Sequence, residues 1–136
     1  MRTGLGVVAA VVALAVTAAA LAALPRYPAT TMKARGFGTV LASANRQALY
    51  YWSREQPGGA IRCTGACAQA WPPLVVPKGI MVKTRIAGIA GRFGVVRRPD
   101  GRRQLTRNGR PLYSYAHEGP GVVLCDDVNG WFVVRL

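Results

Sequence analysis

Residues 45–58 read N-R-Q-A-L-Y-Y-W-S-R-E-Q-P-G, and residues 108–121 read N-G-R-P-L-Y-S-Y-A-H-E-G-P-G. Shifted by 63 positions, the first stretch aligns on the second without a gap. The identical residues are Asn45, Leu49, Tyr50, Glu55, Pro57 and Gly58 against Asn108, Leu112, Tyr113, Glu118, Pro120 and Gly121. A repeat decides the architecture of a chain, and two copies are too few for a solenoid. The sequence therefore predicts one compact domain with pseudo-twofold internal symmetry.

The repeated pattern is a tyrosine, an aromatic residue two positions on and an acid five positions on. Its copies are Tyr50-x-Trp52-x-x-Glu55 and Tyr113-x-Tyr115-x-x-Glu118, and the first is followed by Cys63-x3-Cys67-x3-Trp71-Pro72-Pro73. With a small slip, Cys63 then aligns with Cys125 and Trp71 with Trp131.

From about Gly38 to Leu136 the chain resembles the bacterial family of secreted repeats of unknown function, predicted lipoproteins with a Y-x-(F/W/Y)-x-x-D motif. Both acids are Glu where the family has Asp, and no lipobox cysteine is present, so we expect no lipid attachment. The resemblance implies a fold and an extracytoplasmic location. It implies no reaction, because the activity of the family is unknown.

The N-terminal sequence has the features of an export signal. Residues 4–24 carry no charge, Arg2 precedes them, and Ala20-Leu21-Ala22 offers a small-residue cleavage site. The stretch is also about long enough to span a bilayer. Residues 1–24 are therefore predicted to be a signal peptide or an N-terminal membrane anchor, with the folded part outside in either case. Residues 25–36, which contain two prolines and no apolar period, are predicted to be a linker.

The chain is strongly basic, with 18 Lys and Arg against five acids and a formal net charge of +13. Such a charge favours anionic envelope polymers or lipid head groups as partners, in a salt-dependent way. Nucleic acid is not expected as a partner of an exported protein.

The three cysteines fit an oxidising compartment and allow three different single disulfides. The family pattern, together with proximity in sequence, points to a bridge between Cys63 and Cys67. Cys125 would then remain as the odd thiol.

Short apolar and aromatic segments between turn signals predict a mostly β fold. Asn108-Gly109 is a strong signal for a type I′ hairpin turn, and Pro72-Pro73 would stop a short helical turn over 64–70. Residues 74–91 are expected to form an irregular crossover. The strands are expected at residues 37–42, 48–52, 92–98, 104–107, 111–115 and 130–135. The fold class is thus a single small domain, residues 37–136, of two pseudo-symmetric β-meander repeats (about 38–76 and 92–136) after an N-terminal hydrophobic helix.

Two interpretations of the doubled motif remain open. In a strand, Tyr50 and Trp52 point to one face, and so do Tyr113 and Tyr115. These aromatics are either core residues, with each hydroxyl bonded to a partner such as the acid five residues on, or a paired aromatic–acid site at the symmetry axis.

Few residues in the sequence are suited to catalysis. The Cys63-x3-Cys67 loop is not the C-x-x-C spacing of a redox pair. Zinc would have to use Cys63, Cys67, Cys125 and His117, whose spacings match none of the usual zinc patterns. His117 is the only histidine, and no nucleophile elbow, P-loop or dinucleotide fingerprint occurs. We therefore expect no enzyme, no catalytic residues, no metal and no cofactor.

Arginines concentrate in one predicted meander. They form either a solvated surface or a polyanion-binding face, for which the candidates are Arg97, Arg98, Arg102, Arg103 and Arg107.

The sequence thus favours an exported, non-enzymatic binding or structural module of the cell envelope. The alternative is a small extracytoplasmic redox or metal-linked protein that uses the C-x3-C loop. A third hypothesis is an anchored cytoplasmic protein that binds nucleic acid. It is supported only by the net positive charge and by the basic residues that follow the hydrophobic segment.

Overall fold

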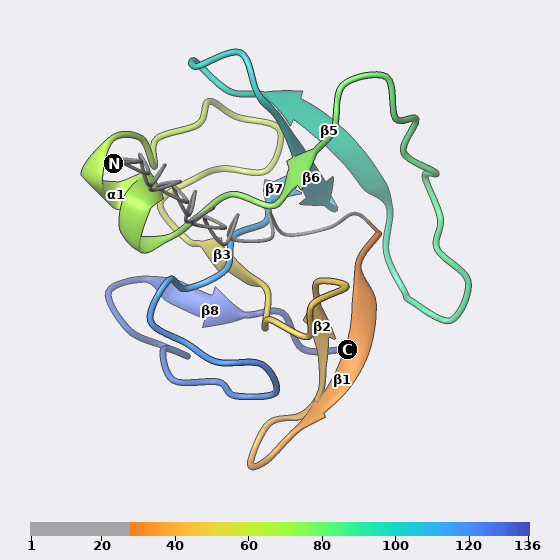
Figure 1. The fold of residues 1–136 in the computed structure, drawn as a ribbon, viewed down its shortest axis with the longest axis vertical. Coiled ribbons are helices and arrows are strands. Elements are labelled where there is room, and N and C mark those ends of the chain that lie inside the picture. The colour runs from red at the N-terminus through yellow and green to blue at the C-terminus, as the bar shows by residue number, and fades with distance from the viewer. Residues whose placement is uncertain (1–27) are drawn as a thin grey trace, which may run out of the picture.

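The computed structural model describes residues 28–136, and this part of the chain consists mainly of short strands and loops (Figure 1). The mostly β fold is therefore confirmed. The predicted signal peptide or anchor, with its hydrophobic helix, lies outside the described residues. The elements are β1 (Thr30–Ala34), β2 (Gly38–Ala42), β3 (Tyr50–Trp52), α1 (Ala66–Ala70), β4 (Val75–Val76), β5 (Phe93–Arg97), β6 (Arg103–Arg107), β7 (Arg110–Pro111) and β8 (Trp131–Val133).

Each half of the domain begins with an antiparallel hairpin. In the first half β1 pairs with β2, and in the second β5 pairs with β6. The predicted linker over 25–36 is therefore wrong for residues 30–34. Met32 and Ala34 are buried while Thr31 and Lys33 are exposed, which is the alternation of a strand with one face on the core.

The two halves exchange their final segments. Leu41, Leu49 and Val134 form a closed ring of backbone hydrogen bonds, in which the N–H of Leu41 donates to Val134 at 2.8 Å, that of Val134 to Leu49 at 2.9 Å and that of Leu49 to Leu41 at 2.9 Å. The first two leucines belong to the first half, whereas Val134 ends the second.

An equivalent ring joins Leu105 and Leu112 of the second half to Leu74 of the first. The N–H of Leu74 donates to Leu112 at 2.9 Å, that of Leu112 to Leu105 at 3.0 Å and that of Leu105 to Leu74 at 2.9 Å. Accordingly, β8 pairs with β3 and β4 pairs with β6. Neither half completes its hydrogen bonding alone, so the halves form one domain.

Several local predictions are confirmed. Asn108 and Gly109, with φ values of 51° and 77°, both adopt the left-handed conformation that a type I′ turn requires, and they connect β6 to β7. The helical turn appears as α1 and ends before Pro72. Residues 74–91 are irregular as expected, except that Val75–Val76 form β4.

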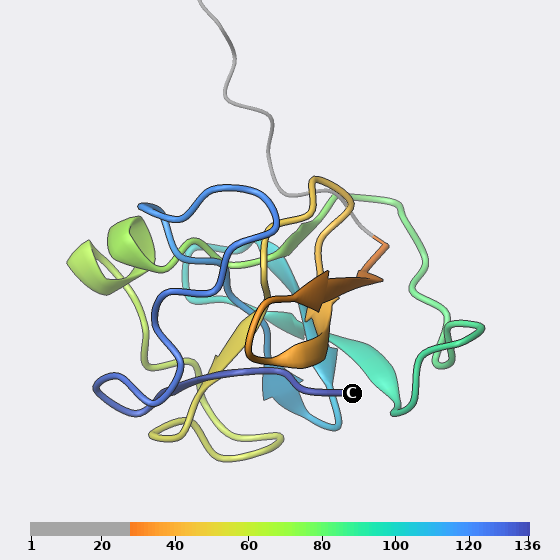
Figure 2. The same ribbon diagram turned by 90° about the horizontal axis from the view of Figure 1, so that it is seen from below.

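Two buried clusters form the core. One surrounds Tyr50, Trp71, Tyr113 and Trp131, and the other contains the leucines of the two hydrogen-bonded rings. The segment 77–92 extends from the side opposite α1 in both ribbon views (Figure 2). Within residues 28–136 no helix is long and apolar enough to cross a membrane.

Candidate functional site

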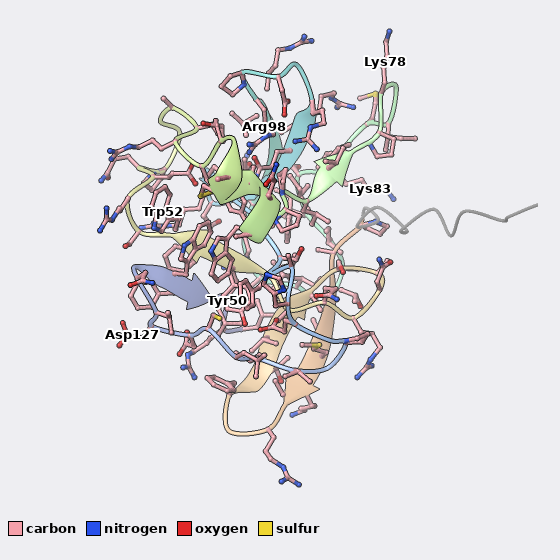
Figure 3. The ribbon with its side chains drawn as sticks, turned by 60° about the vertical axis from the view of Figure 1, so that its left-hand side comes forward. Tyr50, Trp52, Lys78, Lys83, Arg98 and Asp127 are labelled. Carbon is pink, nitrogen blue, oxygen red and sulfur yellow. A yellow bond between two sulfur atoms is a disulfide. The ribbon has the colours of Figure 1, made fainter. Side chains whose placement is uncertain are left out.

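The two copies of the motif meet at Tyr50, which lies near the centre of the domain (Figure 3). Tyr50 and Tyr113 pair in an antiparallel bridge, with N–H···O distances of 2.8 Å from Tyr50 to Tyr113 and 2.9 Å in the reverse direction. The pseudo-twofold axis passes between them because each makes the same contact with the other. Both tyrosines are fully buried.

Each tyrosine hydroxyl donates to the glutamate of the other copy. The distances are 2.5 Å from Tyr50 Oη to Glu118 Oε2 and 2.9 Å from Tyr113 Oη to Glu55 Oε2. The acid five residues along the chain, which the sequence suggested as a partner, is therefore not the one used. The paired aromatic–acid arrangement exists, but it is formed between the repeats and is closed to solvent.

The glutamates also hold the loop that follows each motif. Glu55 Oε2 accepts from the backbone N–H of Arg62 at 2.8 Å and of Cys63 at 3.3 Å. Glu118 Oε2 accepts from the N–H of Leu124 at 2.8 Å. Among the described residues, Oε1 of each glutamate is buried and has no hydrogen-bond partner.

Burial shifts the pKa values of the motif residues. The pKa of Glu118 is raised above its ordinary value, mainly because the carboxyl group is buried. Burial, reinforced by the neighbouring glutamates, also raises the pKa of Tyr50 and Tyr113 far above 10. The phenols therefore act as hydrogen-bond donors at neutral pH.

Four aromatic rings stack across the axis in the order Trp52, Trp131, Trp71, Tyr115. The successive ring centroids are 5.3, 4.0 and 4.7 Å apart. The stack is symmetric, because Trp52 corresponds to Tyr115 and Trp131 to Trp71 in the repeat alignment. Tyr50 meets Trp71 edge-on at 5.3 Å, and Tyr113 meets Trp131 in the same way at 5.1 Å.

The ends of the stack carry equivalent exposed residues. The Arg54 guanidinium carbon lies 5.8 Å from the centre of the Trp52 ring, and His117 lies edge-on to Tyr115 at 5.5 Å. The middle of the stack is buried. The motif residues therefore bind one another, which favours the core interpretation of the aromatics.

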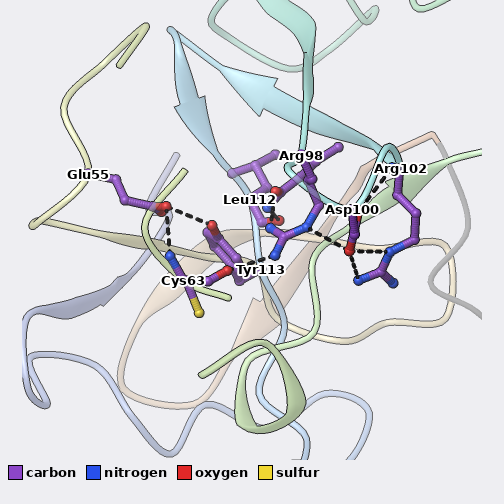
Figure 4. Close-up of polar contacts among 8 residues, drawn as sticks. Glu55, Cys63, Arg98, Asp100, Arg102, Leu112 and Tyr113 are labelled. Atoms are coloured by element: carbon purple, nitrogen blue, oxygen red, sulfur yellow. Dashed lines mark hydrogen bonds and ion pairs between the residues drawn. The ribbon is translucent and has the colours of Figure 1, made fainter. Parts of the chain in front are cut away.

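Arg98 is a correction to the predicted arginine face. It is buried and donates from Nη1 to Gln104 Oε1 and from Nη2 to the Cys63 carbonyl oxygen, each at 2.7 Å (Figure 4). Asp100 lies 3.7 Å from its Nε. Alternation of side chains along a strand would expose only some of these arginines. Arg98, however, follows the end of β5 and turns inward, where Gln104 and a carbonyl oxygen accept from its two terminal nitrogens. Its buried Nε has no hydrogen-bond partner among the described residues.

The remaining predicted arginines divide between two clefts. Arg97, Arg102 and Arg103 line a cleft of about 530 Å³ beside β4, together with Lys78. Arg107 lies in a different cleft of about 510 Å³ between β7 and β8. The five candidates therefore do not form one face.

The predicted bridge between Cys63 and Cys67 is present, with a Cα–Cα distance of 5.2 Å. Cys63 is buried and Cys67 half-buried. Cys125 is a free, half-buried thiol whose pKa is raised by burial and then by Glu118. Within the described part of the chain, no three potential metal ligands come together, and His117 is exposed. The loop before Trp71, with Pro72 and Pro73, is thus shaped by the bridge.

Sequence reasoning missed two participants. Trp131 supplies the second ring of the stack, and its alignment with Trp71 was the signal that could have identified it. Lys78 joins the basic cleft from outside the arginine-rich meander. No sequence pattern connects it to β5 and β6, because only the exchange of β4 brings it there.

A model of the family described as a secreted repeat of unknown function matches residues 31–75. The matched residues hold the first motif and the bridged cysteines, while the second motif lies beyond them. No curated protein matches the chain, and no solved structure does. The description supports an extracytoplasmic location and names no activity. Residues 31–75, less than half of the chain, are thus similar to secreted repeats of unknown function.

Proposed function

We propose that this protein is an exported cell-envelope module that binds anionic polymers and carries out no chemical turnover. The observation that supports it best is the basic cleft of Lys78, Arg97, Arg102 and Arg103. The doubled motif supports the absence of turnover, since its tyrosines and glutamates are buried and bonded to one another.

The charges of the basic cleft are only partly neutralised. Asp100 is the acid in its lining, and it forms an ion pair with Arg102 at 2.8 Å. Arg103 donates to the neutral carbonyl oxygens of Pro77 and Ile80, at 2.9 and 2.8 Å. Arg97 and Arg103 are register partners on β5 and β6, and like charges facing each other across strands repel. A bound anion would relieve that repulsion.

The rest of the surface reinforces this preference. Residues 28–136 contain 16 Lys and Arg and all five acids of the chain. Glu55 and Glu118 are buried, while Asp100 and Asp126 are ion-paired. Most of the positive charge therefore faces solvent without compensation, and attraction to polyanions should weaken as salt screens it.

The test is adsorption to a soluble poly(hexuronic acid) and to isolated cell-wall material over a range of salt concentrations. The double variant Arg97→Gln/Arg103→Gln should bind several-fold more weakly. Lys33→Gln/Arg35→Gln is the matched control, because it removes the same charge from the other hairpin, where both residues are exposed. Equal losses in both variants would reduce the proposal to non-specific attraction, and absence of adsorption at low salt would refute it.

A further inference from the structure

We infer that the cleft between β7 and β8 is a second, more selective site, which binds a sugar unit bearing a carboxylate or phosphate group. It measures about 510 Å³, and its lining includes Tyr51, Arg107, Arg110, Leu112 and Phe132. The choice of ligand rests on the proposed envelope-binding function, whereas the geometry stands independently of it.

The first observation is a pair of arginines that form no ion pair among the described residues, although Asp126 and Asp127 also line the cleft. Arg107 and Arg110 are register partners on either side of the Asn108-Gly109 turn. Like charges placed directly opposite on neighbouring strands destabilise a hairpin. Among residues 28–136 neither arginine forms an ion pair, although Arg102 and Arg135 both do. An anion held between the two guanidinium groups would remove the repulsion.

The second observation is that both guanidinium groups are held in place. Arg107 donates from Nε to the Ala90 carbonyl oxygen at 2.8 Å. A Cβ atom on Gly91 would lie only 2.7 Å from that Nε, and Gly91 has a φ of 112°. The guanidinium therefore occupies space that a larger residue at position 91 would take. Burial also lowers the pKa of Arg107, consistent with a cation that lacks an acidic partner.

Arg110 is held by an aromatic ring. Its guanidinium carbon lies 4.6 Å from the centre of the Tyr51 ring. A guanidinium stacked on an aromatic ring keeps its N–H edge available for hydrogen bonds. With Nε of Arg107 already engaged, the terminal N–H groups of the two arginines can bind the two oxygens of a carboxylate or phosphate.

The remaining lining favours a sugar over a bare anion. Tyr51 and Phe132 stack at 5.7 Å, and the buried Leu112 and Val134 supply further apolar surface. Asp127 also lines the cleft, and it is exposed at the periphery of the domain (Figure 3). The lining thus combines apolar and aromatic surface with charged groups, and such a combination suits a sugar that carries an anionic group. A carboxylate such as Asp127 can accept the hydroxyl protons of a sugar.

The experiment is calorimetric titration of the full chain with four probes: a hexuronic-acid trisaccharide, its neutral hexose counterpart, a hexose phosphate and inorganic phosphate. We expect one or both anionic sugars to bind at low salt, the neutral sugar to bind at least tenfold more weakly, and inorganic phosphate to bind more weakly than the hexose phosphate. Binding of the uronate alone or of the hexose phosphate alone identifies which anionic group the site takes. Inorganic phosphate binding as tightly as the hexose phosphate would overturn the sugar assignment.

Three variants locate the site. Arg107→Gln and Arg110→Gln should each weaken binding by about tenfold or more, the loss expected for a hydrogen bond to a charged group. Arg92→Gln, which removes an exposed arginine outside the cleft lining, should leave binding unchanged. The Asn108 side chain binds the backbone of Arg92, so this control keeps that contact. Circular dichroism checks the fold of each variant.

No binding by either anionic sugar, or equal losses in all three variants, would overturn this inference. Neither result bears on the basic cleft, because polymer adsorption there is tested with Arg97→Gln/Arg103→Gln. Conversely, loss of polymer adsorption in that variant with full retention of sugar binding would show that the two sites act separately.

Discussion

Tyr50 and Tyr113 each donate their backbone N–H to the carbonyl oxygen of the other, at 2.8 and 2.9 Å. Their hydroxyl groups then bind the glutamates of the opposite copies. The same pair of residues thus links the two halves through the backbone and through the side chains. The doubled motif therefore joins the two halves of the domain. One copy alone could not form these contacts, because each tyrosine binds residues of the other copy.

A double-mutant cycle tests this exchange. Combining Tyr50→Phe with Glu118→Ala should reveal a coupling of about 1.5–3 kcal/mol, because their hydrogen bond involves a buried charged group. The measurement is the free energy of unfolding from urea titrations of the four proteins in the cycle.

The control is the cycle of Tyr50→Phe with Glu55→Ala, the acid of the same copy. Tyr50 makes no hydrogen bond to Glu55, so their effects should add to within about 0.5 kcal/mol. A larger coupling within one copy than between copies would contradict the exchanged arrangement.

The aromatic stack should be most sensitive at its centre. Trp71→Ala removes a buried ring that contacts both Trp131 and Tyr115, and we expect a loss of about 3–5 kcal/mol. Trp52→Ala removes the half-buried ring at one end and should cost clearly less. Thermal unfolding followed by near-ultraviolet circular dichroism gives both values, and equal losses would argue against the order of the rings.

Glu118 should contribute to the way the free energy of unfolding changes with pH in the acidic range. Its pKa is raised in the folded state, chiefly by burial, so protonated Glu118 favours folding. That contribution is complete below the unfolded pKa and is lost as the pH rises through the folded value. Glu118→Gln should therefore flatten the change in unfolding free energy as the pH rises above the ordinary glutamate value of about 4. Urea titrations at several pH values give this slope, and an unchanged slope would refute the prediction.

At alkaline pH the buried tyrosines should destabilise the fold. The pKa values of Tyr50 and Tyr113 are raised, first by burial, whereas tyrosines in the unfolded chain ionise near about 10. Stability is therefore lost as the pH rises above about 10. Tyr113→Phe should reduce that loss, measured as the difference in urea midpoint between about pH 8 and 11. A midpoint difference identical to that of the wild type would exclude Tyr113 as a source.

The Cys63–Cys67 bridge should contribute modestly. A loop this short removes little entropy from the unfolded chain, about 2 kcal/mol at most. Cys63→Ser/Cys67→Ser should therefore fold and retain the stack at Trp71, with Cys125→Ser as the background that prevents disulfide exchange. Failure of the double variant to fold at room temperature would assign the bridge a larger role than shaping the loop.

Local patterns predicted the local structure well. Asn108-Gly109 indicated the hairpin turn because both positions tolerate a positive φ, and Pro72-Pro73 marked the end of the helical turn. The predicted linker failed at Thr30–Ala34, where two alternating buried residues are too short a signal to distinguish a strand from a loop. The sequence by itself determined the doubling of the motif and the mostly β fold.

Only the tertiary structure decided which acid each tyrosine uses, which half each final segment joins and which arginines face solvent. The motif suggested Glu55, five residues on, as the partner of Tyr50, yet Glu118 accepts from its hydroxyl. Arg97 and Arg98 are neighbours in sequence, yet the second is buried against Gln104. The physical reason is that spacing along a strand defines the face of a side chain but not the segment packed against that face. That segment is selected by burial and hydrogen bonding over the whole domain.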